Sequence, residues 1–525
     1  MKCVNCLILV AFFVLGAFAN AQAATEVKMT GDVLMYGSYF SNRNFTGWNR
    51  AGKNTEDNFE VWQRIRVRTD FVANEAVKFR LGIKIIDTWG HGTFTAANPT
   101  SGIAIPTGAG GANNITSGVQ IYLAYLQFKV PDTEVQVTAG LQDVNLPQSA
   151  MFSNSPVLAE RVPALTVTAP LIPDTLSFVT GFIRLFDSNQ TFDSTSTSYN
   201  WLTNEYRTHQ ADELDAYFLT LPITFDGFKA TPWGMLAVAG RDADYYDYKN
   251  STEIPPAGGT NFGETLFSAA TMTNGPGSHH KAGSWHNAQN LFYWVGSTFE
   301  VTTLDPIRFY GDVIYGAGAQ NDVKSAQRHG WFMDVGAEYT GFDMVIPRVF
   351  GWWSSGEDKS SGNGSERMAY IRSNWGPGNS FLFDCTQEFT VGGDMNVSPV
   401  GSWGLGASLD KMSFVEKLTH RLSFFYLRGT NSARGLRLAN IMTTATWGSE
   451  GNYVAMGHDL TDNESLVSLN FDTKYMIYEN LAAVVETGWA HGQFQESVWG
   501  HKTYHRASNN GDNEWKVAFG FSYKF

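Results

Sequence analysis

Apolar and polar residues alternate most regularly near the end of the chain. Between residues 515 and 525, WKVAFGFSYKF, every odd position carries a large apolar side chain and every even position a small or charged one. Successive side chains of a β-strand point to opposite faces, so this pattern predicts a strand with one wholly apolar face. Large apolar groups in line, most of them aromatic, favour a strand that faces lipid over the edge of a soluble sheet.

The same alternation recurs along the chain and predicts eighteen strands. They cover residues 27–40, 59–72, 77–85, 119–130, 134–142, 164–169, 176–186, 212–222, 228–240, 289–302, 307–316, 329–339, 344–354, 399–410, 418–429, 464–476, 481–490 and 513–525. The pattern is weakest at 164–169 and 399–410, which leaves sixteen strands as an alternative.

The connections between these strands alternate in length. Short turns include 131–133, 226–227, 304–306, 341–343 and 478–480. Long connections rich in Gly, Ser, Asn and Asp cover 41–58, 88–118, 143–163, 187–211, 241–288, 317–328, 355–398, 430–463 and 491–512. Short periplasmic turns and long extracellular loops are typical of outer-membrane barrels. The sequence therefore predicts an all-β fold, a transmembrane antiparallel β-barrel that encloses a water-filled channel.

The composition and hydropathy of the chain exclude a helical membrane protein and argue against a disordered chain. Aromatic residues make up 14% of the 525 residues and charged residues only 17%, whereas a disordered chain is highly charged and has few aromatic residues. The mean hydropathy is −0.20, and after the N-terminal region no apolar run approaches the ~18 residues of a transmembrane helix. A helical membrane protein is thus excluded, and no linker divides residues 24–525, which we expect to form one barrel domain.

The N-terminal segment predicts export. Lys2 precedes an apolar stretch from Leu7 to Phe18, which is followed by alternating alanines. A positive start, a short apolar centre and an Ala-x-Ala end describe a secretory signal peptide. We expect residues 1–23 to be removed after Ala23, with a cut after Ala21 as the alternative.

Removal of that segment changes the charge and the cysteine content. Of three cysteines only Cys385 stays in the mature chain, so we expect no internal disulfide. Loss of Lys2 leaves 36 basic residues against 50 acidic ones, a net charge of −14. Nucleic acids bind proteins that neutralise their phosphates, so we expect no nucleic-acid partner.

Basic residues gather on the polar face of the second and third predicted strands. They are Arg64, Arg66, Arg68, Lys78, Arg80 and Lys84. An Arg or Lys at the middle of the membrane costs ~2–4 kcal/mol on the lipid face, so we expect this basic ladder to line the pore. A turn centred near Asn74 would pair Asp70 with Lys78, Arg68 with Arg80 and Arg64 with Lys84. Like charges placed opposite each other destabilise a sheet, so the ladder needs either a functional reason or carboxylates from loops that neutralise it.

The third long loop is the candidate constriction of the pore. It covers residues 143–163 and contains Asp143, Glu160 and Arg161. We expect this loop to fold into the channel, where Asp143 and Glu160 would be the constriction-loop acids opposite the arginines. The alternative is that either acid is simply solvated.

Two other groups suggest metal binding only weakly, and we assign neither a metal nor a cofactor. Asp242, Asp244 and Asp247 offer the oxygen ligands that calcium prefers, but their spacing is not that of an EF-hand. His501 and His505 are four residues apart, a spacing that brings side chains together only on a helix. Because we predict a loop there, this spacing does not predict a zinc site.

Three stretches resemble the homotrimeric outer-membrane porins of sulfate-reducing (Desulfovibrio-type) bacteria. They are PVGSWGLGASLDKMSFVEKLTHRLSFFYLRGTNS (399–432), SERMAYIRSNWGPG (365–378) and NFDTKYMIYENLAAVVETGW (470–489). The resemblance implies a passive, trimeric diffusion pore in the bacterial outer membrane, in contact with lipid and lipopolysaccharide. Phe525 resembles the C-terminal assembly signal of such barrels, which implies insertion by the barrel-assembly machinery.

The sequence thus favours a porin that passes small hydrophilic solutes and ions by passive diffusion. The alternative is a substrate-selective channel that favours anions or carboxylates through its basic ladder. An enzyme or a purely structural surface barrel is a weaker alternative. We find no GxSxG or HExxH pattern that would supply an assembled catalytic group, and we expect no enzymatic activity.

Overall fold

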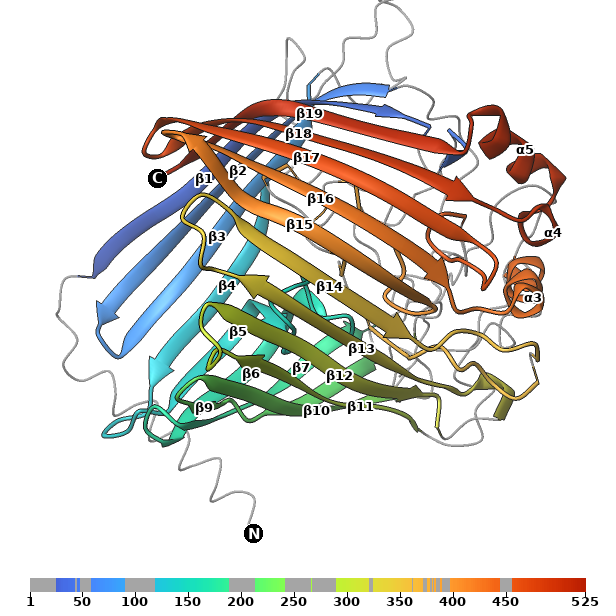
Figure 1. Cartoon of the computed structure of the whole chain (residues 1–525). Helices are drawn as coiled ribbons and strands as arrows, with labels where there is room; N and C mark the ends of the chain where they lie inside the picture. The colour runs from blue at the N-terminus through green and yellow to red at the C-terminus, as the bar shows by residue number, and fades with distance from the viewer. Residues whose placement is uncertain are drawn as a thin grey trace, which may run out of the picture.

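The computed structural model describes residues 25–42, 45–47, 58–89, 119–187, 213–240, 266, 289–320, 324–360, 362–371, 375–377, 380, 382–383, 388–389, 397–443 and 456–525. These residues form one antiparallel sheet of nineteen strand segments (Figure 1). The strands are β1 (Glu26–Ser41), β2 (Asn58–Asn74), β3 (Val77–Thr88), β4 (Val119–Lys129), β5 (Gln136–Asn145), β6 (Ala159–Ile172), β7 (Leu176–Asp187), β8 (Glu213–Thr220), β9 (Ile223–Phe225), β10 (Phe228–Gly240), β11 (Gln289–Val301), β12 (Ile307–Gly318), β13 (Arg328–Tyr339), β14 (Ile346–Ser354), β15 (Ser402–Val415), β16 (Leu418–Gly429), β17 (Ser465–Tyr478), β18 (Leu481–Gln493) and β19 (Asn513–Lys524).

The sheet closes on itself, because β1 pairs with β19 from Asp32 opposite Lys524 to Ser41 opposite Trp515. β8 and β9 take a single place in the ring, since both pair with β10. The break between them contains Pro222, and proline has no N–H to donate to a ladder. The described residues therefore confirm a barrel of eighteen strands and not sixteen. Both weakly patterned regions are strands, β6 and β15.

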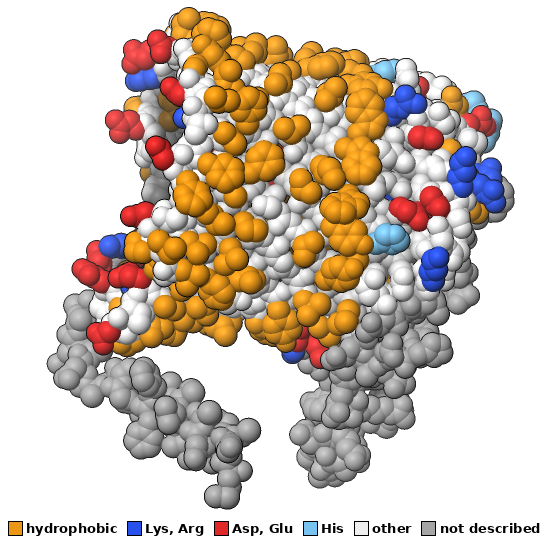
Figure 2. Space-filling model, turned by 60° about the horizontal axis from the view of Figure 1, so that its bottom comes forward, with side chains coloured by type: hydrophobic (Ala, Val, Ile, Leu, Met, Phe, Trp, Pro, Cys, Tyr) orange, Lys and Arg blue, Asp and Glu red, His pale blue; other side chains and the backbone are white. Residues whose placement is uncertain are grey.

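Alternation separates the two faces of the wall as expected. In β19, Phe519 and Phe521 are about half exposed, whereas Ala518 and Lys516 point inward and are buried. A broad apolar surface covers the outside of the barrel between two charged ends (Figure 2). Trp331, Trp353 and Trp515 are exposed near the loop ends of their strands, the place of the aromatic girdle in membrane barrels.

The long connections leave one end of the barrel, and this end carries helices that the sequence analysis missed. α3 (Ala433–Thr443), α4 (Glu496–Trp499) and α5 (His501–Asn509) lie together there (Figure 1). The prediction of plain loops over 430–463 and 491–512 was wrong in this respect, because helices of eleven, four and nine residues are too short to give a clear apolar period. Among the described helices, none has both the length and the apolar character needed to cross a membrane.

The register between β2 and β3 differs from the predicted one by two residues. Asp70 lies opposite Arg80, not Lys78, and Lys84 lies opposite Arg66. The position of the turn is the reason: it is centred between Glu75 and Ala76 and not near Asn74, and a bulge between Val72 and Asn74 compensates one residue of this displacement. The Asn74 side chain accepts a hydrogen bond from the backbone N–H of Ala76 at 2.8 Å and fixes this tighter turn.

Candidate functional site

Three arginines of β2 converge on one carboxylate inside the barrel. Asp32 of β1 is only 4% exposed and lies opposite Arg66 in the ladder. The Nε of Arg66 donates to it at 2.8 Å, Nη2 of Arg64 lies 3.3 Å from it and Nη2 of Arg68 3.9 Å. A single negative charge thus faces three positive ones, and this part of the wall keeps an excess of positive charge.

The remaining basic residues of the predicted ladder are placed differently from one another. Arg80 forms a two-pronged pair with Asp70, with both N–O distances 2.6 Å. Lys84 is the strand partner of Arg66 and extends the positive cluster, while Lys78 lies opposite Val72. Neutralisation of the ladder therefore comes partly from carboxylates on the wall itself and not only from loops.

Arg64, Arg66 and Arg68 line a cavity of about 540 Å³ inside the barrel. Its wall includes Thr30 and Asp32 of β1, Ser522 and Lys524 of β19, and Glu388 from the connection between β14 and β15. Phe525 closes one side, where its backbone exchanges two hydrogen bonds with Gly31, at 2.8 and 3.0 Å. The cavity is polar and open enough to hold water and an anionic group beside the guanidinium groups.

Acids and bases alternate along the wall from β12 to β16. Glu338 receives a hydrogen bond from Nε of Arg348 at 2.9 Å, and Arg308 lies 3.7 Å from the same carboxylate. Asp410 lies 2.6 Å from Nη1 of Arg348 and 3.2 Å from Nε of Arg421. Positive and negative charges are nearly balanced on this wall, whereas the wall near Asp32 has an excess of positive charge.

The loop between β5 and β6 folds into the barrel. The backbone N–H of Ser149 donates to Asp312 of β12 at 2.6 Å, although β12 is several strands away round the ring. The ring of Phe152 stacks on Trp375 at 5.3 Å and packs edge-on to Phe350 of β14 at 5.6 Å. An apolar cluster thus fixes residues 146–158 against the inner face of the wall.

Asp143 and Glu160 do not belong to this inner loop. Asp143 is in β5 and Glu160 in β6, because the ladder continues up to Asn145 opposite Ala159. Asp143 is the strand partner of Arg161, with an N–O distance of 2.8 Å, and its side chain is 63% exposed. Their naming as constriction-loop acids was therefore wrong in position, since a strand's end cannot be read from periodicity where a cross-strand ion pair extends it.

A second segment, from the connection between β14 and β15, also lies within the barrel. The indole Nε1 of Trp294 in β11 donates to the carbonyl of Ala369 at 2.6 Å. The backbone N–H of Leu382 donates to Asn470 of β17 at 3.2 Å, and Phe389 stacks on Tyr36 of β1 at 4.5 Å. The prediction of a wholly external loop over 355–398 was wrong for its described part, because Trp375, Leu382 and Phe389 are buried inside the barrel.

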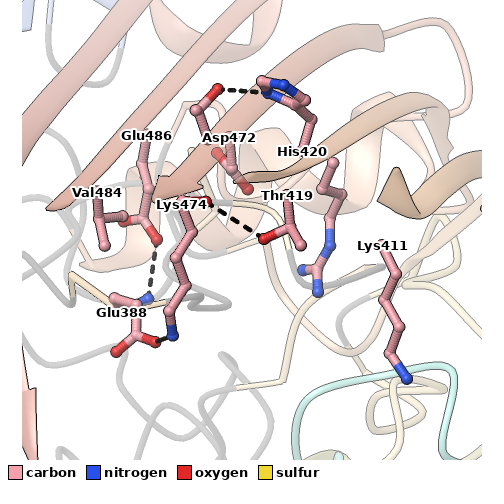
Figure 3. Close-up of a pocket in the computed structure, with 10 residues that line it drawn as sticks. Glu388, Lys411, Thr419, His420, Asp472, Lys474, Val484 and Glu486 are labelled. Carbon is pink, nitrogen blue, oxygen red and sulfur yellow. Dashed lines mark hydrogen bonds and ion pairs between the residues drawn. The ribbon is translucent and has the colours of Figure 1, made fainter. Parts of the chain in front are cut away.

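Glu388 attaches this segment to strands β17, β18 and β19. Its carboxylate pairs with Lys474 of β17 and accepts a hydrogen bond from Ser522 of β19 at 3.0 Å. Its own backbone N–H donates to the buried Glu486 at 2.8 Å. Figure 3 shows Glu388 with Lys474 and Glu486 in a smaller cavity of about 160 Å³, where Asp472 and His420 lie on the other side. Glu388 lines both cavities and lies between them.

Glu357 is a buried acid outside the strands, next to the end of β14. It accepts a hydrogen bond from the Ser365 hydroxyl at 2.5 Å, and its backbone bonds to Asn431 and Ser432 near α3. Burial raises the pKa of Glu357 to about 7, although the Ser365 hydrogen bond and the charge of Arg367 oppose the rise. The carboxyl is therefore partly protonated at neutral pH.

Sequence reasoning missed Asp32, Glu338, Asp410 and Glu388. The first three lie at inward positions of predicted strands, so the same alternation that found the arginines could have found them. Glu388 gives no such signal, because nothing periodic marks a loop that folds inward. Residues 1–23, Asp242, Asp244, Asp247 and Cys385 lie outside the described residues.

No protein-family model matches this sequence, and no curated protein is similar to it. Among solved structures, the chain is similar to the outer membrane protein OprD of Pseudomonas aeruginosa, with 11% identity, a TM-score of 0.48 and 96% of each chain covered. OccK2 (OpdF) of the same organism, in complex with glucuronate, gives 9% identity and a TM-score of 0.48 over 95% of this chain and 98% of that one. OccAB1 of Acinetobacter baumannii gives 13% identity and a TM-score of 0.47 over 97% of this chain and 99% of that one.

At such identities and TM-scores the similarity does not indicate what this protein does, so its function is inferred from its own residues. They form a ring of eighteen antiparallel strands, closed between β1 and β19, with an apolar outer belt and a charged interior. Wide barrels with these two surfaces are the transmembrane channels of outer membranes. The chain therefore has the fold of an outer-membrane porin.

Proposed function

We propose that this protein is a porin of the bacterial outer membrane that passes small hydrophilic solutes and ions by passive diffusion. One observation carries the proposal: a single strand presents both surfaces that a channel wall needs. On β2, Phe59 and Phe71 are exposed on the outside, whereas Arg64 and Arg66 line the inner cavity. Charged groups on an inner wall are stable only when water or counter-ions reach them, and a ring of this size leaves an aqueous channel.

The inner loop at 146–158 is the proposed constriction of this channel. Its contacts with Asp312 and with the cluster of Phe350 and Trp375 hold it against the wall. The arginine-lined cavity is one polar part of the remaining interior. Solutes would then pass between the loop and the positive wall, where a transverse field orients dipolar molecules.

Single-channel recording tests the porin proposal. The purified chain, added to a planar bilayer in potassium chloride, should give stable current steps whose size follows the salt conductivity. Absence of steps from protein that is folded and inserted, as judged by its β-rich circular dichroism in lipid vesicles, would favour a structural surface barrel instead.

The resemblance to homotrimeric porins supports a trimer, and we include it in the proposal. The signal peptide at 1–23 would direct export, lipid and lipopolysaccharide would surround the apolar belt, and the strand that ends at Phe525 would engage the barrel-assembly machinery. Current steps that arrive in groups of three, together with a trimeric mass in detergent, support this assembly. Single steps and a monomeric mass contradict it.

Anion preference is the second candidate function, and the shared carboxylate at Asp32 favours it. Three guanidinium groups within 3.9 Å of one acid leave excess positive charge on the cavity wall. Small anions such as carboxylates would be concentrated there. Reversal potentials in asymmetric salt should therefore show a permeability for chloride above that for potassium.

The substitution Arg66→Glu tests the role of the ladder directly. It reverses the charge at the centre of the cluster, so the ratio of anion to cation permeability should fall several-fold. Lys129→Glu is the matched control, because Lys129 lies at a short turn in a pair with Glu134 and should leave the ratio unchanged. Equal ratios for the wild type and Arg66→Glu would exclude the ladder as the selectivity element.

A further inference from the structure

A cluster of potential metal ligands lies at the loop end of the barrel, apart from the pore. Glu496 belongs to α4, and His501 and His505 are one turn apart on α5. The two imidazole rings are 4.0 Å apart between their centres, and Nδ1 of His501 lies 2.6 Å from Oε1 of Glu496. One ligand atom from each of the three residues lies within 4.8 Å of the other two.

The helix explains why these side chains meet. On an α-helix, residues i and i+4 lie on the same face, so the four-residue spacing of His501 and His505 becomes meaningful once α5 forms. Gly500, with φ of 80°, makes the sharp bend between α4 and α5, and glycine adopts that backbone region at little cost. The bend returns Glu496 to the face that carries the two histidines.

We propose that Glu496, His501 and His505 bind a first-row transition-metal ion, with Zn²⁺ the ion that suits this ligand set best. Imidazole nitrogen and carboxylate oxygen are both zinc ligands, at about 2.0–2.2 Å from the metal. Two histidines and one glutamate supply three positions of a tetrahedron and leave the fourth to water. Magnesium and calcium prefer oxygen ligands throughout and are not expected to bind.

The surroundings suit a site that fills from the external solution. All three ligands are exposed, so an ion can enter without any opening of the structure. The other side of the two helices is fixed to the barrel end: Nε1 of Trp499 donates to Glu464 at 2.8 Å, and Nδ2 of Asn510 donates to the carbonyl of Phe45 at 3.4 Å. A bound ion would join α4 to α5 on their open side and stiffen this external connection.

Cobalt absorption tests the site, because Co²⁺ replaces Zn²⁺ and its visible bands report tetrahedral coordination. The full chain, purified without a histidine tag, is titrated with Co²⁺ in detergent and then with Zn²⁺. We expect tetrahedral bands that saturate at one ion per chain at this site and that Zn²⁺ abolishes. His501→Gln with His505→Gln should remove these bands, and Glu496→Gln should weaken binding about tenfold or more.

His329→Gln is the matched control, since His329 is an exposed histidine of β13 far from α5 in sequence. It should leave the titration unchanged, which separates this site from other histidines of the chain. As a second measurement, Zn²⁺ should slow amide hydrogen exchange at residues 496–509 in the wild type but not in the double variant. Unchanged bands in the double variant, or octahedral bands only, would overturn the proposal.

Discussion

At the scale of single residues, the charge of the pore wall depends on one buried carboxylate. Asp32 is the partner of three arginines of β2, and the inward position of all four follows from the alternation of their strands. Guanidinium groups this close repel one another, and Asp32 reduces that repulsion. The same residue therefore affects both the stability of the wall and its electric field.

Asp32→Asn should separate these two roles. Removal of one partner from a buried charged group destabilises by about 3–5 kcal/mol, and water in the cavity should reduce that cost. We expect a lower urea midpoint of unfolding, together with a higher ratio of chloride to potassium permeability. Asp143→Asn is the control, because Asp143 pairs with Arg161 at an exposed position and should cost less than about 1 kcal/mol.

Glu357 predicts a pH dependence of the external segment next to α3. Its pKa is about 7 in the folded chain and lies near 4.5 in its ordinary state, so folding favours the protonated form. The resulting stabilisation, up to about 3 kcal/mol, is complete below pH 4.5 and is lost as the pH rises through 7. Hydrogen exchange of residues 355–367, corrected for intrinsic rate, should therefore show less protection at pH 8 than at pH 5.

Glu357→Gln should remove most of this pH dependence, because the amide stays neutral throughout. Glu479→Gln, at an exposed short turn, should retain the wild-type profile. Equal protection of the wild-type segment at both pH values would contradict the raised pKa.

At the scale of elements, two connections fold inward and pack on the wall. The loop 146–158 and the segment that contains Trp375 share one aromatic cluster with Phe350 and Trp352. Buried aromatic residues contribute strongly to packing. The position of each inner segment thus depends on the other.

Phe152→Ala should loosen the inner loop without disturbing the strands. A buried Phe→Ala change costs about 3–5 kcal/mol, and here that cost falls on the attachment of the loop. We expect a larger conductance with more current noise, measured in planar bilayers. Phe424→Ala, which removes an outward-facing ring of β16, should leave the conductance unchanged.

The elements also show how far sequence reasoning can reach. Strand positions follow from an alternation that spans many residues, and β10 and β16 begin and end where the pattern places them. The β2–β3 register does not follow, because the turn lies at Glu75 and Ala76, further along the chain than the pattern suggests, and a bulge beside Asn74 adds a further offset. The positions of the inner segment around Glu388 and of the helices α4 and α5 depend on contacts with residues far away in the sequence, which no local pattern records.

At the scale of the whole molecule, the outer surface is an apolar belt between two charged rims (Figure 2). Residues of β13 illustrate the division: Val335 is 57% exposed on the outside, whereas its neighbour Asp334 is 6% exposed inside. An apolar outer face and a charged inner face suit a barrel in a bilayer, because lipid contacts the outside and water the inside.

Val335→Arg should therefore impair insertion. A charge on the lipid face near mid-membrane costs about 2–4 kcal/mol, which a urea titration of folding into lipid vesicles can measure. Thr30→Glu, which adds a charge to the inner cavity wall opposite Arg68, should cost much less. Equal costs at the two positions would contradict the assigned faces.

The pairing of β1 with β19 has a consequence for how the barrel folds. These strands are the most distant pair in the sequence, yet they must meet to complete the ring. Every earlier stage is an open ribbon with two bare edges, which can recruit a foreign strand as readily as the correct one. Bringing such remote segments together is also entropically slow. Until β1 and β19 pair, their open edges can therefore pair with other chains, and slow closure favours aggregation.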